Sequence, residues 1–363
     1  MPVKFDQLMI NNYLDRAIEE FNTNPLSAGL IRRMANEVPD LFVAAALRYL
    51  DSPDESAAHR FLTSLMLRQD GVFEEVADPA RGSLQRSINL FNRLCKMDAG
   101  FDVKLARKLP DRAGHNHTHA FDRAHCCRVL DMLNETSIGR RLIPMLKHLV
   151  DSPDSVIAAK ATLFVGRRMQ SPEWAARQIT RDNPEDVRAK AIESLWGVKS
   201  QSAQELLEDC VADESVRVAG NALVGLHMLG KPGIMEQIAG MVNSETPGYR
   251  TTAAWSMGKI GDSSFADPLM EMLKDESAEV RSAALQSLLQ LRKAEAAARE
   301  EAEKNAPQPE PIASAAVEAP VEAEEPVESD VPEVVEETPL IDMDIRLDGS
   351  AHSTRSDRLD ESV

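Results

Sequence analysis

The chain has 363 residues, of which 43% are hydrophobic and only 4% aromatic, and it carries a formal net charge of −18. Small and unbranched apolar residues dominate, which favours closely packed helices over strands. No stretch approaches the ~20 apolar residues of a membrane span, and the first 13 residues lack a secretory pattern, so we expect a cytoplasmic protein without a membrane segment.

The first part of the chain predicts helix pairs that resemble one another weakly. Residues 5–21 and 26–37 form a leading pair. Residues 47–62 echo residues 146–164, and the shared Asp-Ser-Pro-Asp begins at Asp51 and at Asp151. Because 100 residues fit three periods of about 33, as in helical repeats, we place further turns near 78–83 and 110–118.

A histidine-rich segment, HNHTHAFDRAHCC, follows these units. In an extended loop residues two apart face the same side, so three imidazoles and a fourth from the next helix could converge on zinc. The alternative is a polar surface loop, which we favour because the pattern is loose and the loop holds no carboxylate. We therefore expect no metal and no cofactor, with these weak candidate ligands: His115, His117, His119 and His125.

The four cysteines are Cys95, Cys126, Cys127 and Cys210, and none forms a CxxC pair. Cys126 and Cys127 are adjacent and too constrained for an ordinary bridge. We expect reduced thiols, as in a cytoplasmic protein.

Charge is banded along the chain. Residues 81–148 hold 13 Lys and Arg against six Asp and Glu, whereas residues 1–80 and 149–309 each carry −6. The band is either ordinary solvated surface, a site for an acidic protein, or a site for phosphate, and the overall acidity disfavours nucleic acid. Its basic residues are Arg81, Arg86, Arg93, Lys96, Lys104, Arg107, Lys108, Arg112, Arg123, Arg128, Arg140, Arg141 and Lys147.

A repeat of about 30 residues follows. RDNPEDVRAKAIESL (181–195) matches KDESAEVRSAALQSL (274–288), and two similar units lie between them, anchored with the others at Val187, Val216, Tyr249 and Val280. Each unit reads as a short helix, a turn rich in Asp, Ser and Pro, and a second helix with one apolar stripe. One such pair cannot bury its own stripe, so stacked neighbours must cover it.

The Asp-turn-Val-Arg-x-x-Ala pattern resembles HEAT repeats, in particular the short bacterial type also seen in phycobilin-lyase-like HEAT proteins, most clearly over residues 142–290. The resemblance implies an armadillo-like α-solenoid of about nine helix pairs over residues 1–304. It also implies a ladder of hydrogen bonds between successive units, weakened at the unit of Arg250, where Ser244 stands in place of Asp. The implied ladder residues are Asp182, Arg188, Asp213, Arg217, Arg250, Asp275 and Arg281.

The composition changes abruptly at residue 305. Residues 305–345 contain no Lys or Arg, proline recurs, and residues 310–363 carry 16 acidic residues against three arginines. Low hydrophobicity with high charge predicts a disordered acidic tail over 305–363. The tail is either a solubilising segment or a carrier of a docking motif at 339–347, and it can also contact the basic band within the same chain.

These features favour a protein-binding scaffold that uses the inner face of the solenoid, and not an enzyme. The sequence has no nucleophile elbow, P-loop or dinucleotide fingerprint, and none of the His-Glu dipeptides of the HEAT-like deoxyhypusine hydroxylases. Two alternatives stay open: a metal-dependent or bilin-lyase-like enzyme at residues 115–125, and nucleic-acid binding through residues 81–148. Trp174, Trp196 and Trp255 belong to the core or to a binding groove.

Overall fold

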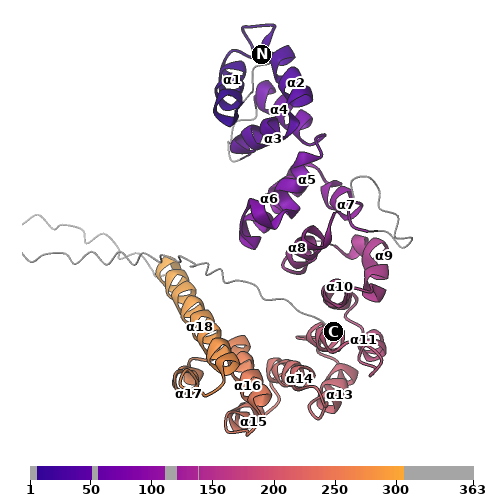
Figure 1. Cartoon of the computed structure of the whole chain (residues 1–363), viewed down its shortest axis with the longest axis vertical. Coiled ribbons are helices and arrows are strands. Elements are labelled where there is room, and N and C mark those ends of the chain that lie inside the picture. The colour runs from indigo at the N-terminus through magenta and orange to yellow at the C-terminus, as the bar shows by residue number, and fades with distance from the viewer. Residues whose placement is uncertain (1–5, 51–55, 111–120, 138, 306–363) are drawn as a thin grey trace, which may run out of the picture. The chain divides into compact units, whose positions relative to one another are not determined.

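The computed structural model describes residues 6–50, 56–110, 121–137 and 139–305, and these residues form helices joined by turns, with no strand (Figure 1). The expected all-helical fold is therefore confirmed. The chain divides into Met1–Ala306 and Pro307–Val363, and every described residue lies in the first unit. The predicted tail, apart from residue 305, and the histidines at 115, 117 and 119 lie outside the described residues.

Eighteen α-helices and five 3₁₀ segments make up the described part of the chain. None of these helices is both long enough and apolar enough to cross a lipid bilayer. In order, the helices are α1 (Gln7–Glu19), α2 (Ser27–Glu37), α3 (Pro39–Ala46), α4 (Ala57–Met66), α5 (Gly71–Ala77), α6 (Leu84–Met97), α7 (Phe101–Ala106), α8 (Arg123–Asn134), α9 (Ile143–Leu146), α10 (Ser155–Met169), α11 (Pro172–Gln178), α12 (Glu185–Glu193), α13 (Gln201–Cys210), α14 (Val216–Met228), α15 (Ile234–Met241), α16 (Pro247–Ile260), α17 (Ala266–Met272) and α18 (Ala278–Asn305). The 3₁₀ segments are η1 (Leu47–Tyr49), η2 (Pro79–Arg81), η3 (Arg140–Leu142), η4 (Lys147–Asp151) and η5 (Ser263–Phe265).

The second helix of each C-terminal pair begins at a regular interval. The residues just before α10, α12, α14, α16 and α18 are 30 or 31 positions apart: Asp154, Pro184, Ser215, Thr246 and Ser277. The Asp154 carboxylate accepts the N–H groups of Val156 and Ile157, and the Ser215 hydroxyl accepts that of Val218. These side chains satisfy helix-start donors that have no partner inside the helix.

This interval places the unit of α14 two residues later than the alignment of the repeats at Val216 does. The buried valine that corresponds to Val187 and Val280 is Val218, whereas Val216 is only partly buried. Two residues correspond to about 200° around a helix. The shift therefore exchanges the buried face of α14 for the opposite one.

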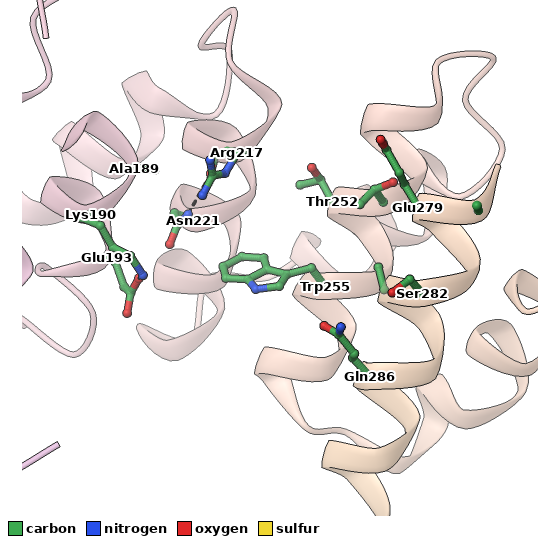
Figure 2. A pocket seen from close by; sticks show the side chains of 13 residues that line it. Ala189, Lys190, Glu193, Arg217, Asn221, Thr252, Trp255, Glu279, Ser282 and Gln286 are labelled. Carbon is green, nitrogen blue, oxygen red and sulfur yellow. Dashed lines mark hydrogen bonds and ion pairs between the residues drawn. The ribbon is translucent and has the colours of Figure 1, made fainter. Parts of the chain in front are cut away.

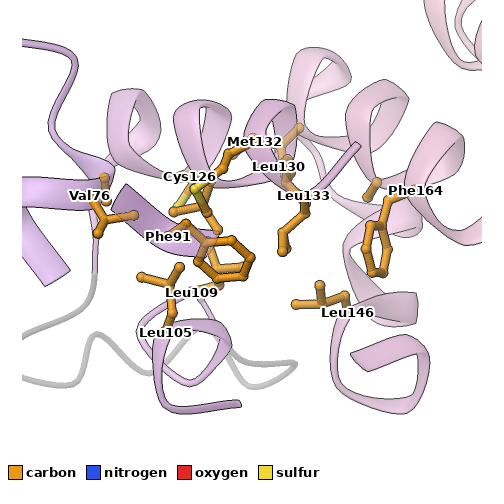
Figure 3. Close-up of a cluster of buried hydrophobic side chains, with 14 of the residues drawn as sticks. Val76, Phe91, Leu105, Leu109, Cys126, Leu130, Met132, Leu133, Leu146 and Phe164 are labelled. Carbon is orange, nitrogen blue, oxygen red and sulfur yellow. The ribbon is translucent and has the colours of Figure 1, made fainter. Parts of the chain in front are cut away.

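The second helices pack against one another in succession, from α8 through α10, α12, α14 and α16 to α18. The positions three and seven residues after the pre-helix residue, such as Val218 and Ala222, face this core. In the preceding part of the chain, Phe91, Leu130 and Phe164 belong to the same continuous core (Figure 3). Each pair thus contributes one layer of an extended core.

Glycines allow two of the second helices to approach their neighbours closely. A Cβ on Gly166 of α10 would lie 2.2 Å from the Oγ of Ser194, the residue that follows α12, and one on Gly258 of α16 would lie 2.4 Å from Ser287 Oγ of α18. At the equivalent contact between the units of α12 and α14 the glycine lies on the following unit, because Gly225 of α14 packs against Trp196. Each of these close contacts therefore depends on a glycine on one of the two sides.

Candidate functional site

A groove opens along the second helices α12, α14, α16 and α18. It encloses about 630 Å³, within the range of ligand sites in proteins. Most of its side chains stand five, six or nine residues after the pre-helix residue, so the same helical face recurs in successive units. The lining residues are Ala189, Lys190, Glu193, Arg217, Asn221, Thr251, Thr252, Trp255, Ala278, Glu279, Ser282, Ala283 and Gln286.

Trp255 is the largest side chain of the groove, and it extends from α16 toward Asn221 of α14 (Figure 2). The centroid of the Trp255 ring lies 6.2 Å from that of Trp196. Lys259 Nζ lies 5.9 Å from the centroid of the Trp255 ring. Trp196 Nε1 in turn donates to the backbone oxygen of Asn221 at 2.9 Å. These contacts hold an apolar aromatic surface at a fixed place in the groove.

Two polar atoms of the groove lack the partners that buried groups need. Asn221 is 6% exposed, and its Nδ2 donates to Arg217 O at 2.8 Å. Its Oδ1 is buried without a hydrogen-bond partner, and so is Thr251 Oγ1. An unsatisfied buried polar atom costs about 1–3 kcal/mol, so the helices that line the groove carry two hydrogen-bonding atoms whose capacity is unused.

Most charges of the groove are neutralised by neighbours. Lys190 and Arg167 both pair with Glu193, and Arg217 pairs with Asp186. Glu279, at the end formed by α18, is exposed and forms no ion pair with the described residues. The groove therefore presents an aromatic ring with amide and hydroxyl groups, and little net field.

Sequence reasoning named Trp255 as a possible groove residue but missed Asn221, Thr251, Ser282 and Gln286. The signal that finds them is the repeat itself, since they recur at the same positions after each helix start. With the third unit set at Val216, Asn221 is assigned to a different face of α14.

Two rungs of the expected ladder join successive units. Arg188, which is 6% exposed, donates from Nη1 to both carboxylate oxygens of Asp213 at 3.0 and 3.1 Å. Arg250 donates from Nε and Nη2 to Asp275 at 2.7 and 2.9 Å, and this hydrogen bonding lowers the pKa of Asp275. Both aspartates also accept the N–H of the pre-helix serine of their own turn at 2.8 Å.

The other ladder residues lie elsewhere. Arg217 is two residues before the ladder position of α14, which is occupied by Ala219, and it faces the groove. Ala219 and Ser244 therefore replace both partners of one rung together. Asp182 is exposed, and the following pre-helix residue, Pro184, has no N–H to offer it. Arg281 donates to the carbonyl oxygens of Asp275 and Glu276 in its own turn.

Much of the basic band is engaged in contacts within the molecule. Arg86 pairs with Glu75, Lys104 with Asp98, Lys108 with Asp70, Arg123 with Asp154, and Arg141 with the buried Asp102. Arg128 donates to Gly82 O at 3.0 Å. Lys96, Arg107 and Arg140 are exposed, as is Arg93, which has its own contact.

His125 is the one candidate metal ligand that the structure describes, and carboxylates occupy both sides of its ring. Nδ1 lies 2.7 Å from Asp122 Oδ1, and Nε2 lies 3.0 Å from Glu74 Oε2 at an angle outside hydrogen-bond geometry. Burial disfavours the charged ring, but the Asp122 hydrogen bond and the Glu74 carboxylate outweigh it and raise the pKa of His125. Among the described residues, no three His, Cys, Asp or Glu side chains are arranged to hold a metal ion.

The four cysteines are free thiols. Burial raises the pKa of Cys126 and of Cys210 to about 12 and that of Cys95 to about 11. The reactive species of cysteine is the thiolate. These three thiols are therefore protonated and unreactive at neutral pH.

Comparison with known proteins identifies the repeat in part of the chain. Residues 234–319, which include α15 to α18, match the family model of HEAT repeats. Human deoxyhypusine hydroxylase in complex with glycerol is a similar solved structure, with 16% identity over 72% of this chain and 99% of that chain, and a TM-score of 0.31. No curated protein sequence matches the chain. The expected resemblance to HEAT repeats is confirmed.

Proposed function

We propose that this HEAT-repeat chain is a non-catalytic scaffold that binds a segment of a protein partner in the groove around Trp255. The observation that carries the proposal is the groove itself, about 630 Å³ in volume, in which an aromatic ring, Trp255, lies among hydroxyl and amide side chains such as Ser282 and Gln286. A polypeptide offers both an N–H group at every residue and apolar side chains. It therefore complements this surface in two ways at once.

The charge distribution of the groove supports a polypeptide over a polyanion. Lys190 and Arg217 already pair with carboxylates, and Glu279 adds negative charge. A nucleic acid would have to break these pairs, and phosphate contacts depend on available cations. A largely uncharged segment requires no such exchange.

The lining residues also support binding without catalysis. The groove contains no histidine or cysteine among its 13 described lining residues. A nucleophile and an adjacent base are the usual machinery of covalent catalysis. Ser282 is exposed on α18, and the groove offers it no histidine as a base.

The test uses two variants of α18 that carry the same charge change. Ser282→Arg places a long cation in the groove, whereas Gln290→Arg places one on the same helix outside the groove. Both tagged proteins, with the unchanged chain, are used for quantitative affinity purification from the cells of origin. We expect specific partners to be lost with Ser282→Arg and kept with Gln290→Arg.

Circular dichroism and melting curves of both variants must match those of the unchanged chain, so that loss of binding is not loss of fold. A recovered partner should also change the tryptophan fluorescence of the unchanged chain when purified and added back. Identical partner sets for both variants would contradict binding in this groove.

A further inference from the structure

The last helix pair has an apolar face that the described residues leave uncovered. Leu285 and Leu289 of α18 are 51% and 57% exposed, and Leu273, which directly follows α17, is 36% exposed. Leu285 stands eight residues after the pre-helix residue. The residues at the same position of α12, α14 and α16 are Ile192, Leu223 and Ala254, which are 0%, 3% and 0% exposed. In each preceding unit the next unit buries this position.

Arg281 adds a polar element to the same face. Its Nη1 donates to the carbonyl oxygens of Asp275 and Glu276 at 2.7 and 2.8 Å. Arg250 uses its own Nη1 in the same way, on Ser244 and Glu245. Arg250 then gives Nε and Nη2 to Asp275 of the next unit, whereas no described residue accepts these donors of Arg281. The guanidinium therefore has a free edge that suits a carboxylate.

The molecule itself shows what covers such a face. The covering helices α14 and α18 follow an aspartate that stands two residues before the pre-helix residue, Asp213 and Asp275. They bury valine, alanine and leucine at positions three, seven and eleven after that residue: Val218, Ala222 and Leu226 in α14, and Val280, Ala284 and Leu288 in α18. A glycine or serine stands at position ten, where the helices approach most closely.

We propose that the exposed face of α18 is a docking site for an amphipathic helix of another protein, preceded by an aspartate in its N-terminal turn. The aspartate binds the free edge of Arg281, and the apolar stripe of the helix covers Leu285 and Leu289. This surface differs from the groove around Trp255, on another face of α18, so the proposal does not depend on the proposed function.

The test uses a labelled, end-capped peptide with the sequence of residues 274–291, which plays this covering role on α16. Fluorescence anisotropy is measured with the full chain. We expect saturable binding that Arg281→Gln weakens roughly 10-fold, since the bond joins two charges. The Asp275→Asn form of the peptide should bind the unchanged chain as weakly, and combining both changes should add little. Leu285→Glu together with Leu289→Glu should abolish binding.

Met228→Glu is the matched control, because Met228 is 45% exposed on another helix, and it should leave binding unchanged. Loss of binding with Arg250→Gln but not with Arg281→Gln would mean that the peptide replaces α18 on α16, which overturns the proposal. No saturable binding to the full chain overturns it too. So does sedimentation that shows the chain itself dimerising through Leu285 and Leu289, since the occupant is then a second copy.

Discussion

At the scale of single residues, the two rungs of the ladder are stronger than ordinary surface ion pairs. Arg188 and Asp213 are largely withdrawn from solvent, with side chains 8% and 17% exposed, and the carboxylate also accepts a backbone N–H of its own turn. A pair of this kind is costly to break, because removing one partner leaves the other buried and charged. It also fixes the turn of one unit to the helix of the previous one.

Arg188→Ala should therefore destabilise the chain by about 1–3 kcal/mol, because Asp213 keeps its charge without its partner. Arg217→Ala is the matched control. Its pair with Asp186 is exposed, so its loss should cost within about 0.5 kcal/mol. Urea unfolding of both variants measures the difference. Equal costs would show that the ladder position has no special structural role.

The pKa of His125 predicts a dependence of stability on pH. A pKa that is raised in the folded state stabilises the chain below the unfolded value of about 6.5, and this contribution is lost as pH rises through the folded value. We expect the unchanged chain to exceed His125→Gln in melting temperature by more at pH 5.5 than at pH 8.5. A constant difference between these pH values would argue against charged contacts with Asp122 and Glu74.

The sequence predicts that Arg–Asp pairs link successive units, but it predicts less well which residues form them. The repeated turn pattern points to Arg188, Asp213, Arg250 and Asp275, and in the structure these four residues form the two rungs. Arg217 is misplaced because Asp-Glu-Ser-Val-Arg is two residues shorter than the equivalent segments of its neighbours. Only the helix start at Ser215, and the burial of Val218, set the register.

At the scale of elements, the closeness of two second helices depends on a missing side chain. Gly258 lies in the interior of α16, where glycine weakens a helix relative to alanine. Close packing against Ser287 of α18 offsets this loss of helix stability. The Cα of Ser287 would lie only 2.9 Å from a Cβ added to Gly258. Backbone cannot yield as a side chain can, so this contact sets the distance between α16 and α18.

Gly258→Ala should therefore destabilise the chain, because overpacking costs about 1–3 kcal/mol and the better helix propensity of alanine restores at most about 1 kcal/mol. Gly240→Ala in α15 is the control, since nothing lies within 4 Å of its added Cβ. That variant should be neutral or slightly more stable. Thermal unfolding of both distinguishes the cases, and a stabilised Gly258→Ala would contradict the close packing.

At the scale of the whole molecule, most of the described basic residues of the band form ion pairs or hydrogen bonds within the chain. The net charge of −18 repels polyanions over long range. We expect the chain to elute from heparin below about 0.2 M salt, because few band residues are free to replace counterions. Elution well above this concentration, reduced by Arg107→Glu, would favour the nucleic-acid alternative.

Composition and period predict the all-helical fold well, because both are local properties of the chain. The groove is harder to predict, since its lining comes from four helices that are more than 90 residues apart at their extremes. It forms only when the units are stacked in register. The uncovered face of α18 is harder still, because Leu285 reads like any core residue of the repeat.

The missing rung between α14 and α16 has a mechanical consequence. Three buried polar atoms without partners, on Asn221, Thr251 and Ser256, also belong to these two helices. The junction therefore lacks the Arg–Asp pair and leaves buried hydrogen-bonding groups unsatisfied. Under tension, elastic units in series stretch most where the stiffness is lowest. We expect a single chain pulled from its ends to lengthen first between α14 and α16, and optical tweezers with Ala219→Arg and Ser244→Asp together should raise the force of that step. A bound segment that contacts all four helices from α12 to α18 would bridge this junction and raise its stiffness.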